Sequence, residues 1–276
     1  MPEIVPPPLP LSASVAPVPR WRWWVHLLLI VPFPLVIGLL GSFRHGSHQA
    51  ALTGSWQGLL KVSALQVVLF GLPLGLGLWV SKTTLDDLML RCRHFGRQVV
   101  WGMGYSVAIR LALGVFSALI CAVLILTHMA TSATLGAFIH ANRPEVETLV
   151  DLHTLKHNPA YFWLTLTLVS FVIAGLREEL WRSASLTALR KLWPGKFGTR
   201  AGEYAAVALT SILFGFGHLP QGVLAIGATT LIGFALGSIM VFHRSTWLAV
   251  IAHGMFDATS FVMIALVIDK LPQMPG

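Results

Sequence analysis

Residues 161–193 read YFWLTLTLVSFVIAGLREELWRSASLTALRKLW and decide how the rest of the chain is interpreted. Residues 161–176 are mostly apolar, and a charged cluster, REELWR at 177–182, follows directly. A membrane-spanning helix needs ~20 mostly apolar residues, and a charge inside one costs at least ~2.5–3.5 kcal/mol on insertion scales. A helical pattern that joins such a run to such a cluster indicates a membrane helix bundle with a polar site in its interior.

The composition of the whole chain also indicates lipid around the protein. Of the 276 residues, 55% are hydrophobic and 11% are charged, whereas soluble domains carry about 25% charged residues. We therefore expect an all-α, polytopic membrane helix bundle whose first partner is the lipid bilayer. The net charge of +8 comes from Lys and Arg residues scattered through short loops, which is typical of membrane topology signals and not of nucleic-acid binding.

Seven or eight transmembrane helices are expected from the apolar segments. An eighth crossing would arise if residues 177–193 or the region 129–160 crossed separately. Residues 82–97 are rich in Lys and Arg and predict an amphipathic stretch on the membrane surface. The seven candidate spans are residues 23–43, 59–80, 99–126, 161–193, 203–218, 223–242 and 246–268.

The chain divides into three parts. Residues 1–20 form a Pro-rich, mobile N-terminal tail, residues 21–160 an N-terminal transmembrane region with interfacial segments, and residues 161–270 a transmembrane core that holds the polar motifs. With seven spans, the basic loops 82–97 and 190–200 fall on the same side as the N-terminus. The positive-inside rule then predicts a cytoplasmic N-terminus. We separately expect the membrane to be the inner membrane of a bacterial cell.

The charged cluster at 177–182 contains two adjacent glutamates. At 100° per residue, Glu178 and Glu179 point to different faces of a helix. Arg182 lies four residues after Glu178 and three after Glu179, so it can reach either carboxylate and keep it ionised.

Two further polar motifs lie in apolar surroundings. In FGFGHLP (214–220), Phe214 and His218 are one turn apart, and the two glycines allow another helix to approach closely. In AVIAHGMFDATSF (249–261), His253 and Asp257 are also one turn apart and can face one cavity.

The depth of these motifs connects them. Glu178 lies twelve residues, or ~18 Å of helix, from the nearest basic loop. His218 lies at most ~27 Å from basic residues on the same side, and His253 lies ~14 Å from them. We therefore expect all three side chains near the middle of the bilayer, in one polar site.

Such a site suits hydrolysis by an activated water molecule. A carboxylate beside a histidine can take a proton from water, and a second histidine with an aspartate can donate hydrogen bonds to an oxyanion. Two histidines and a carboxylate are equally a zinc site with an open position. Composition leaves both alternatives open.

In this order the motifs resemble those of the CPBP family of intramembrane proteases, which includes the type II CAAX prenyl endopeptidases. The family pattern is EExxxR, then FxxxH, then Hxxx(N/D); residues 214–218 fit the second motif and residues 253–257 the third. The stretch GFALGSIMVFHRSTWLAVIAH (233–253) also resembles the segment before the last motif. The resemblance covers about residues 160–265.

The first motif departs from the family pattern by one residue. Arg182 follows Glu178 by four residues, where the family arginine follows its first glutamate by five. Without a gap, Arg177 takes the position of the first glutamate, which is the catalytic one in the family. We take Glu178 as the base, with Glu179 as the alternative.

The resemblance implies an intramembrane endopeptidase without a cofactor, with zinc as the lesser alternative. One glutamate and the first histidine would activate water, the second histidine and the aspartate would stabilise the oxyanion, and the arginine would hold the glutamates. The implied substrate is a peptide or membrane protein, and no nucleic acid is expected. The catalytic and supporting side chains implied in this way are Glu178, Glu179, His218, His253, Asp257, Arg182 and Phe214.

Two rival functions use the same residues. A non-catalytic membrane chaperone or immunity-type protein could share the fold, and it would tolerate changes at Glu178 and His218. A proton-coupled transporter could use the same buried groups, but transporters are commonly built from two repeated halves. No such repeat is visible in the sequence.

Overall fold

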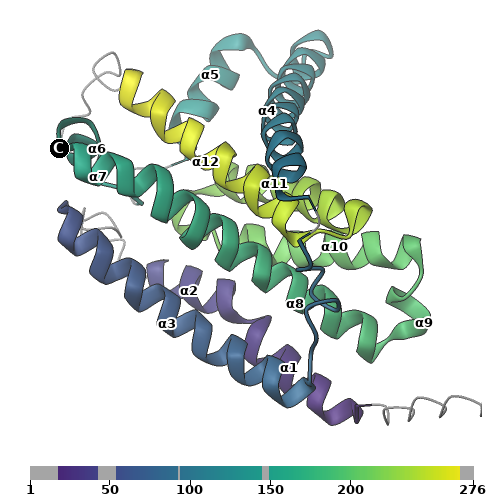
Figure 1. Cartoon of the computed structure of the whole chain (residues 1–276). Coiled ribbons are helices and arrows are strands. Elements are labelled where there is room, and N and C mark those ends of the chain that lie inside the picture. The colour runs from purple at the N-terminus through teal and green to yellow at the C-terminus, as the bar shows by residue number, and fades with distance from the viewer. Residues whose placement is uncertain (1–17, 43–53, 93, 145–148, 268–276) are drawn as a thin grey trace, which may run out of the picture.

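The computed structural model describes residues 18–42, 54–92, 94–144 and 149–267, and every regular element in this part of the chain is a helix (Figure 1). The predicted all-α fold is confirmed. The predicted tail, residues 1–20, lies outside the described residues except for 18–20. The elements are α1 (Arg20–Ile30), α2 (Phe33–Ser42), α3 (Trp56–Ser81), α4 (Phe95–Leu126), α5 (Ser132–Ala141), α6 (Leu152–His157), α7 (Pro159–Leu164), a π-helix (Thr165–Leu176), α8 (Arg177–Leu192), α9 (Pro194–Phe197), α10 (Arg200–Phe216), a 3₁₀ turn (Leu219–Gln221), α11 (Val223–His243) and α12 (Thr246–Val267).

Five of the described helices are long and apolar enough to cross a membrane, as expected of an integral membrane protein. They agree with the second, third, fourth, sixth and seventh predicted spans to within a few residues. Their bounds are Trp56–Ser81, Phe95–Leu126, Pro159–Leu192, Val223–His243 and Thr246–Val267.

The first predicted span, 23–43, is two helices and not one. α1 ends at Ile30 and α2 begins at Phe33, with a turn at residues 31–32 between them. Pro32 has no N–H to donate to the preceding turn and its ring clashes with that turn, which breaks a helix. The fifth predicted span corresponds to α10, which has 17 residues and is therefore at the lower limit of the length of a membrane-spanning helix.

Residues 82–97 are predicted as an amphipathic stretch on the membrane surface, and in the structure residues 85–89 of this stretch form turns that pack against the bundle. Leu88 and Met89 are buried. The Leu88 carbonyl accepts hydrogen bonds from Ser183 Oγ (2.6 Å) and Thr246 Oγ1 (2.6 Å). The irregular backbone is therefore satisfied by side chains of α8 and α12, an arrangement that hydropathy does not reveal.

The helix from α7 to α8 is continuous and contains the twelve-residue π-helix Thr165–Leu176. Ser170 Oγ donates to the carbonyl of Thr165, five residues earlier, at 2.9 Å. This wide segment packs along α12, where Gly254 lies against the Phe171 ring and a Cβ added to Gly254 would overlap that ring. The π-helix brings the charged cluster at the start of α8 against α12.

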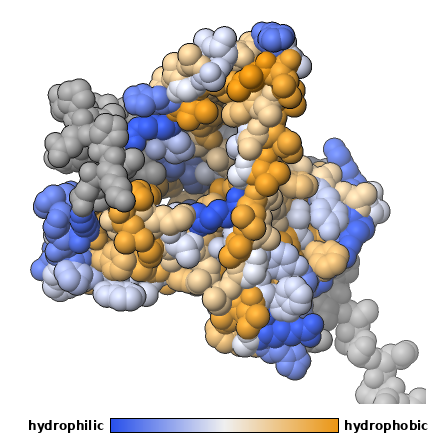
Figure 2. Space-filling view, turned by 90° about the horizontal axis from the view of Figure 1, so that it is seen from above, coloured by the Kyte–Doolittle hydropathy of each residue, from blue (hydrophilic) through white to orange (hydrophobic). Residues whose placement is uncertain are grey.

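Figure 1 shows α3, the α7–α8 helix and α12 running side by side, whereas much of α4 stands away from the bundle. The space-filling view in Figure 2 shows a face on which hydrophobic residues predominate. At one end of the bundle, Glu203 Oε1 accepts a hydrogen bond from Arg190 at 3.1 Å, and Glu203 Oε2 accepts one from Arg244 at 2.7 Å. Arg190 also donates to the Asp87 carbonyl at 2.9 Å, so the loops 82–97 and 190–200, which are predicted to lie on one side of the membrane, meet in space.

Candidate active site

Glu179 is the most deeply buried carboxylate of the charged cluster, with no exposed side-chain surface. Arg182, equally buried and one turn later on α8, forms an ion pair with it. His253 on α12 donates from Nδ1 to Glu179 Oε1 at 2.9 Å. The sequence allowed Arg182 to reach either glutamate, and the structure pairs it with Glu179.

Arg182 occupies a space that is shaped by α10 and α11. Its guanidinium carbon lies 5.0 Å from the centre of the Phe214 ring, which adds a cation–π attraction. A Cβ added to Gly233 would come within 3.3 Å of an Arg182 nitrogen, and one added to Gly237 within 3.1 Å of Arg182 Cδ. The two glycines of α11 therefore leave the room that this buried arginine fills.

Glu178 has a different environment from its neighbour. Its side chain is 17% exposed, and its Oε1 accepts a hydrogen bond from Arg177 at 2.8 Å. Its Oε2 lies 3.8 Å from His253 Nε2, and its charge acts on His218. Glu178 is thus the carboxylate that keeps some accessible surface beside both histidines.

His253 and Asp257 face the same site, as their spacing predicted. His253 Nε2 lies 3.7 Å from Asp257 Oδ2 and 3.8 Å from Glu178 Oε2. Because Nδ1 donates to Glu179, Nε2 is the nitrogen that this histidine presents to the other two carboxylates. The Asp257 side chain is 28% exposed.

Phe214 lies in the last turn of α10, and His218 follows the helix directly before the 3₁₀ turn. The rings of the two residues are 4.7 Å apart, and His218 Nδ1 donates to the Phe214 carbonyl at 3.0 Å. His218 Nε2 is therefore left free to accept a proton. A Cβ added to Gly215 would lie 2.8 Å from the Ile226 carbonyl on α11, and one added to Gly217 would lie 2.9 Å from Pro34 Cβ on α2. The close approach predicted for these glycines is confirmed.

Arg110 is a charged neighbour of the site that the sequence reading did not single out. It lies in α4 and donates to the carbonyl of Phe256 at 2.8 Å and to Thr259 Oγ1 at 2.7 Å. The charge of Asp257 acts on it. The signal was present in the sequence, because a lone arginine inside the span 99–126 carries the same insertion cost as the other charges.

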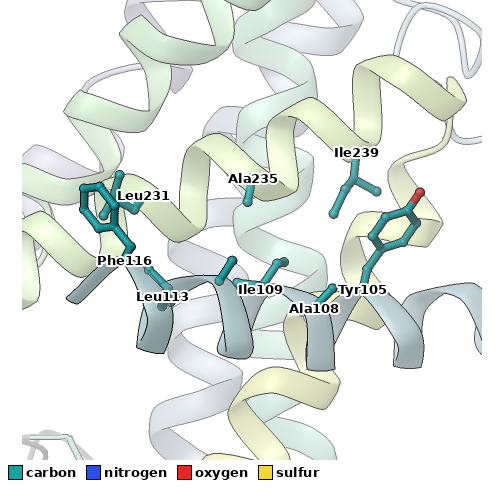
Figure 3. Close-up of a pocket in the computed structure, with 9 residues that line it drawn as sticks. Tyr105, Ala108, Ile109, Leu113, Phe116, Leu231, Ala235 and Ile239 are labelled. Carbon is teal, nitrogen blue, oxygen red and sulfur yellow. The ribbon is translucent and has the colours of Figure 1, made fainter. Parts of the chain in front are cut away.

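Two further observations concern metal binding and a neighbouring groove. Among the residues that the structure describes, no group of three or more His, Cys, Asp or Glu side chains is arranged to hold a metal ion. An apolar groove of about 480 Å³ lies between α4 and α11 (Figure 3), lined by residues that include Tyr105, Ile109, Phe116 and Leu231. None of the predicted site residues lines this groove.

The arrangement brings three carboxylates, two histidines and two arginines from α8, α10 and α12 together inside the helix bundle. The groups divide into an inner pair, Glu179 with Arg182, and a more accessible set around His253 Nε2. Such a division can hold one set rigid while the other exchanges protons with a bound molecule.

Comparison with known families finds a similarity in the second half of the chain. A model described as type II CAAX prenyl endopeptidase Rce1-like matches residues 159–259. The matched residues hold all seven side chains that the sequence singled out. No curated protein and no solved structure matches the chain.

Proposed function

We propose that the protein is an intramembrane endopeptidase that hydrolyses a peptide bond with an activated water molecule, since residues 159–259 match the type II CAAX prenyl endopeptidase Rce1-like family model. The observation that carries the proposal is the meeting of Glu178, His253 and Asp257 within 4 Å, at 3.8 and 3.7 Å, inside the helix bundle. Ionisable groups are placed inside a bilayer at high cost, and they commonly mark functional sites.

Glu178 is the proposed general base. Glu179 has both oxygens committed to His253 and Arg182 and has no exposed surface, whereas Glu178 is partly exposed. A base must reach the proton that it takes. We therefore take Glu178 and not Glu179 as the base. We infer that Glu179 and Arg182 hold His253 in place.

In the proposed reaction, Glu178 takes a proton from water, with His218 Nε2 as a second acceptor beside it. The hydroxide attacks the carbonyl carbon of the scissile bond. His253 donates from Nε2 to the developing oxyanion, and Asp257 in its acid form donates a second hydrogen bond. As the C–N bond breaks, the leaving amine takes the proton from Glu178.

The proposal extends to the rest of the chain. We infer that α10, and α1 with α2, join the five long helices in the membrane, which gives the seven spans expected from the sequence; eight would need a further crossing. Residues 21–160 then shield a catalytic core of residues 161–270. The basic end around Arg190 and Arg244 would be cytoplasmic by the positive-inside rule, with the N-terminus on that side of a bacterial inner membrane.

A cleavage assay in liposomes tests the proposal with a library of quenched fluorescent peptides. Glu178→Gln and His218→Ala are each expected to lower kcat/KM by about 10²–10⁴-fold, the usual contribution of a positioned acid or base. Asp86→Asn is the matched control, since Asp86 is an exposed partner of Arg91 outside the site. Each variant is measured with and without a metal chelator, and loss of wild-type activity in chelator would move the proposal to a zinc enzyme.

One observation favours the non-catalytic rival. When the first motif is matched to the family pattern without a gap, Arg177 takes the position of the first glutamate, and its pairing with Glu178 opposes proton uptake by the proposed base. Arg177→Glu would restore the family pattern at this position. A wild type without any cleavage, beside an active Arg177→Glu variant, would establish that the natural chain has lost catalysis on a protease fold.

A further inference from the structure

A second concave site lies at the basic end of the bundle, at the C-terminal end of α3. A pocket of about 600 Å³ opens there between the start of α1 and the end of α3, within the size range of small-ligand sites. The residues that line this pocket include Trp21, Arg22, Leu78, Trp79 and Lys82. The proposed catalytic chemistry uses none of them.

The charge of this pocket is positive. Arg22 and Lys82 both line it, and no acidic side chain does. Among the described residues neither cation forms an ion pair, and the Nε atom of Arg22 is buried without a hydrogen-bond partner. Lys82 follows the last residue of α3 in the left-handed conformation. Its backbone N–H donates to the carbonyl of Trp79 at 3.3 Å, so the position of the Lys82 backbone is fixed. A negatively charged group is the complement of such a pocket.

The aromatic residues place this pocket at the edge of the bilayer. Trp21 is 58% exposed and Trp79 is 77% exposed. Exposed tryptophans beside Lys and Arg at the end of an apolar helix are typical of the level of the lipid headgroups. α3 is one of the helices long enough to span the membrane, and its last residue, Ser81, directly precedes Lys82.

An apolar track leads from the pocket toward the middle of the membrane. Leu72, Leu76 and Trp79 are spaced four and three residues apart, so they lie on one face of α3, and each is exposed. Gly75 lies beside this face, and a Cβ added there would meet nothing within 4 Å. The helix therefore presents an exposed apolar face, open to a hydrocarbon chain, directly below its cationic pocket.

We propose that this pocket binds the phosphate headgroup of an anionic phospholipid, with one acyl chain lying along the α3 track. The phosphate contacts Arg22 and Lys82, and the two tryptophans flank it at headgroup depth. A free phosphate would satisfy the cations but would leave the apolar track unused. The site is separate from the candidate active site and does not depend on proteolysis.

The test measures lipid binding to the full chain in nanodiscs of phosphatidylcholine with increasing phosphatidylglycerol. Native mass spectrometry counts the bound phosphatidylglycerol, and thermal unfolding in phosphatidylcholine alone checks that each variant is folded. Arg22→Gln/Lys82→Gln is expected to weaken binding about 25-fold, because each cation near anionic lipid contributes about fivefold. Lys61→Gln/Lys196→Gln removes the same charge from exposed sites elsewhere and is expected to leave binding unchanged.

Two further measurements identify the ligand. Gly75→Leu fills the track and is expected to weaken phosphatidylglycerol binding while leaving both cations in place. Inorganic phosphate and glycerol phosphate are added separately, and neither is expected to stabilise the protein. Equal lipid binding by both double variants would overturn the proposal, and so would phosphate binding that is lost in Arg22→Gln/Lys82→Gln but unaffected by Gly75→Leu.

Discussion

The two halves of the chain differ in how much of their apolar helices is buried inside the protein. In the apolar window of α4, 6% of the residues are buried inside the protein, whereas the windows of the Pro159–Leu192 helix and of α12 are each 39% buried. The first half turns apolar side chains outward, and the second half packs charged residues inward. The comparison shows that hydrophobicity is common to both halves, whereas the cluster of paired acids and bases in the interior belongs to the second half.

The largest effect on stability should come from the inner ion pair of the second half. Arg182→Gln leaves the fully buried Glu179 carboxylate without its counter-charge, and breaking a buried pair in this way costs about 3–5 kcal/mol. Unfolding in mixed micelles of increasing SDS measures the loss. Arg97→Gln, on the exposed side of α4, is the control and should change the free energy of unfolding by less than about 0.5 kcal/mol. Similar values for the two variants would break the comparison.

Glycines give the next largest contrast. Gly215→Ala places a Cβ 2.8 Å from the Ile226 carbonyl, and overpacking against a neighbouring helix costs about 1–3 kcal/mol. Gly104→Ala on α4 puts the same methyl group into open space and should be neutral or slightly stabilising. The same unfolding assay compares the two variants, and equal costs would contradict the packing of α10 on α11.

Arg110 tests the connection between the two halves, because it lies in α4 and its charged side chain contacts α12 of the second half. Arg110→Gln removes the positive charge that acts on Asp257 and weakens the contacts with α12. We expect the loss of these contacts to displace Asp257 and to lower kcat about tenfold with KM nearly unchanged. Arg110→Lys keeps the charge but cannot make all the hydrogen bonds of the guanidinium, so it should lower kcat by a similar factor, whereas recovery of kcat in Arg110→Lys would assign the effect to the charge.

The smallest effect is expected on the outer face of α4. Leu119 is 58% exposed, so Leu119→Phe exchanges one apolar side chain for another where lipid is the neighbour. Stability and cleavage should both stay within about 0.5 kcal/mol of the wild type. A large loss in liposomes would show that another part of a protein, and not lipid, covers this face.

The sequence predicted the helical fold, five of the long helices and the meeting of the three polar motifs. Each of these follows from local patterns: apolar runs of sufficient length, charges at matched depth, and residues one turn apart. The sequence could not predict which acid Arg182 pairs with, because Glu178 and Glu179 are both in reach along the helix. That choice depends on His253, which comes from another helix and donates to Glu179.

Two further features were missed for different reasons. The break at Pro32 was readable, since proline inside a helix removes a hydrogen bond, but the apolar composition on both sides concealed it. The π-helix Thr165–Leu176 has no such local signal. It is the packing against α12, with Gly254 beside Phe171, that accompanies the wider turns.

The π-helix has a consequence for how this domain can change during evolution. A wide helical segment accommodates more residues per turn than an α-helix, so one residue can be gained or lost within it while both ends keep their positions. The segment Thr165–Leu176 directly precedes the motif REELWR. We therefore expect a one-residue insertion or deletion within this segment to leave Glu179 facing His253.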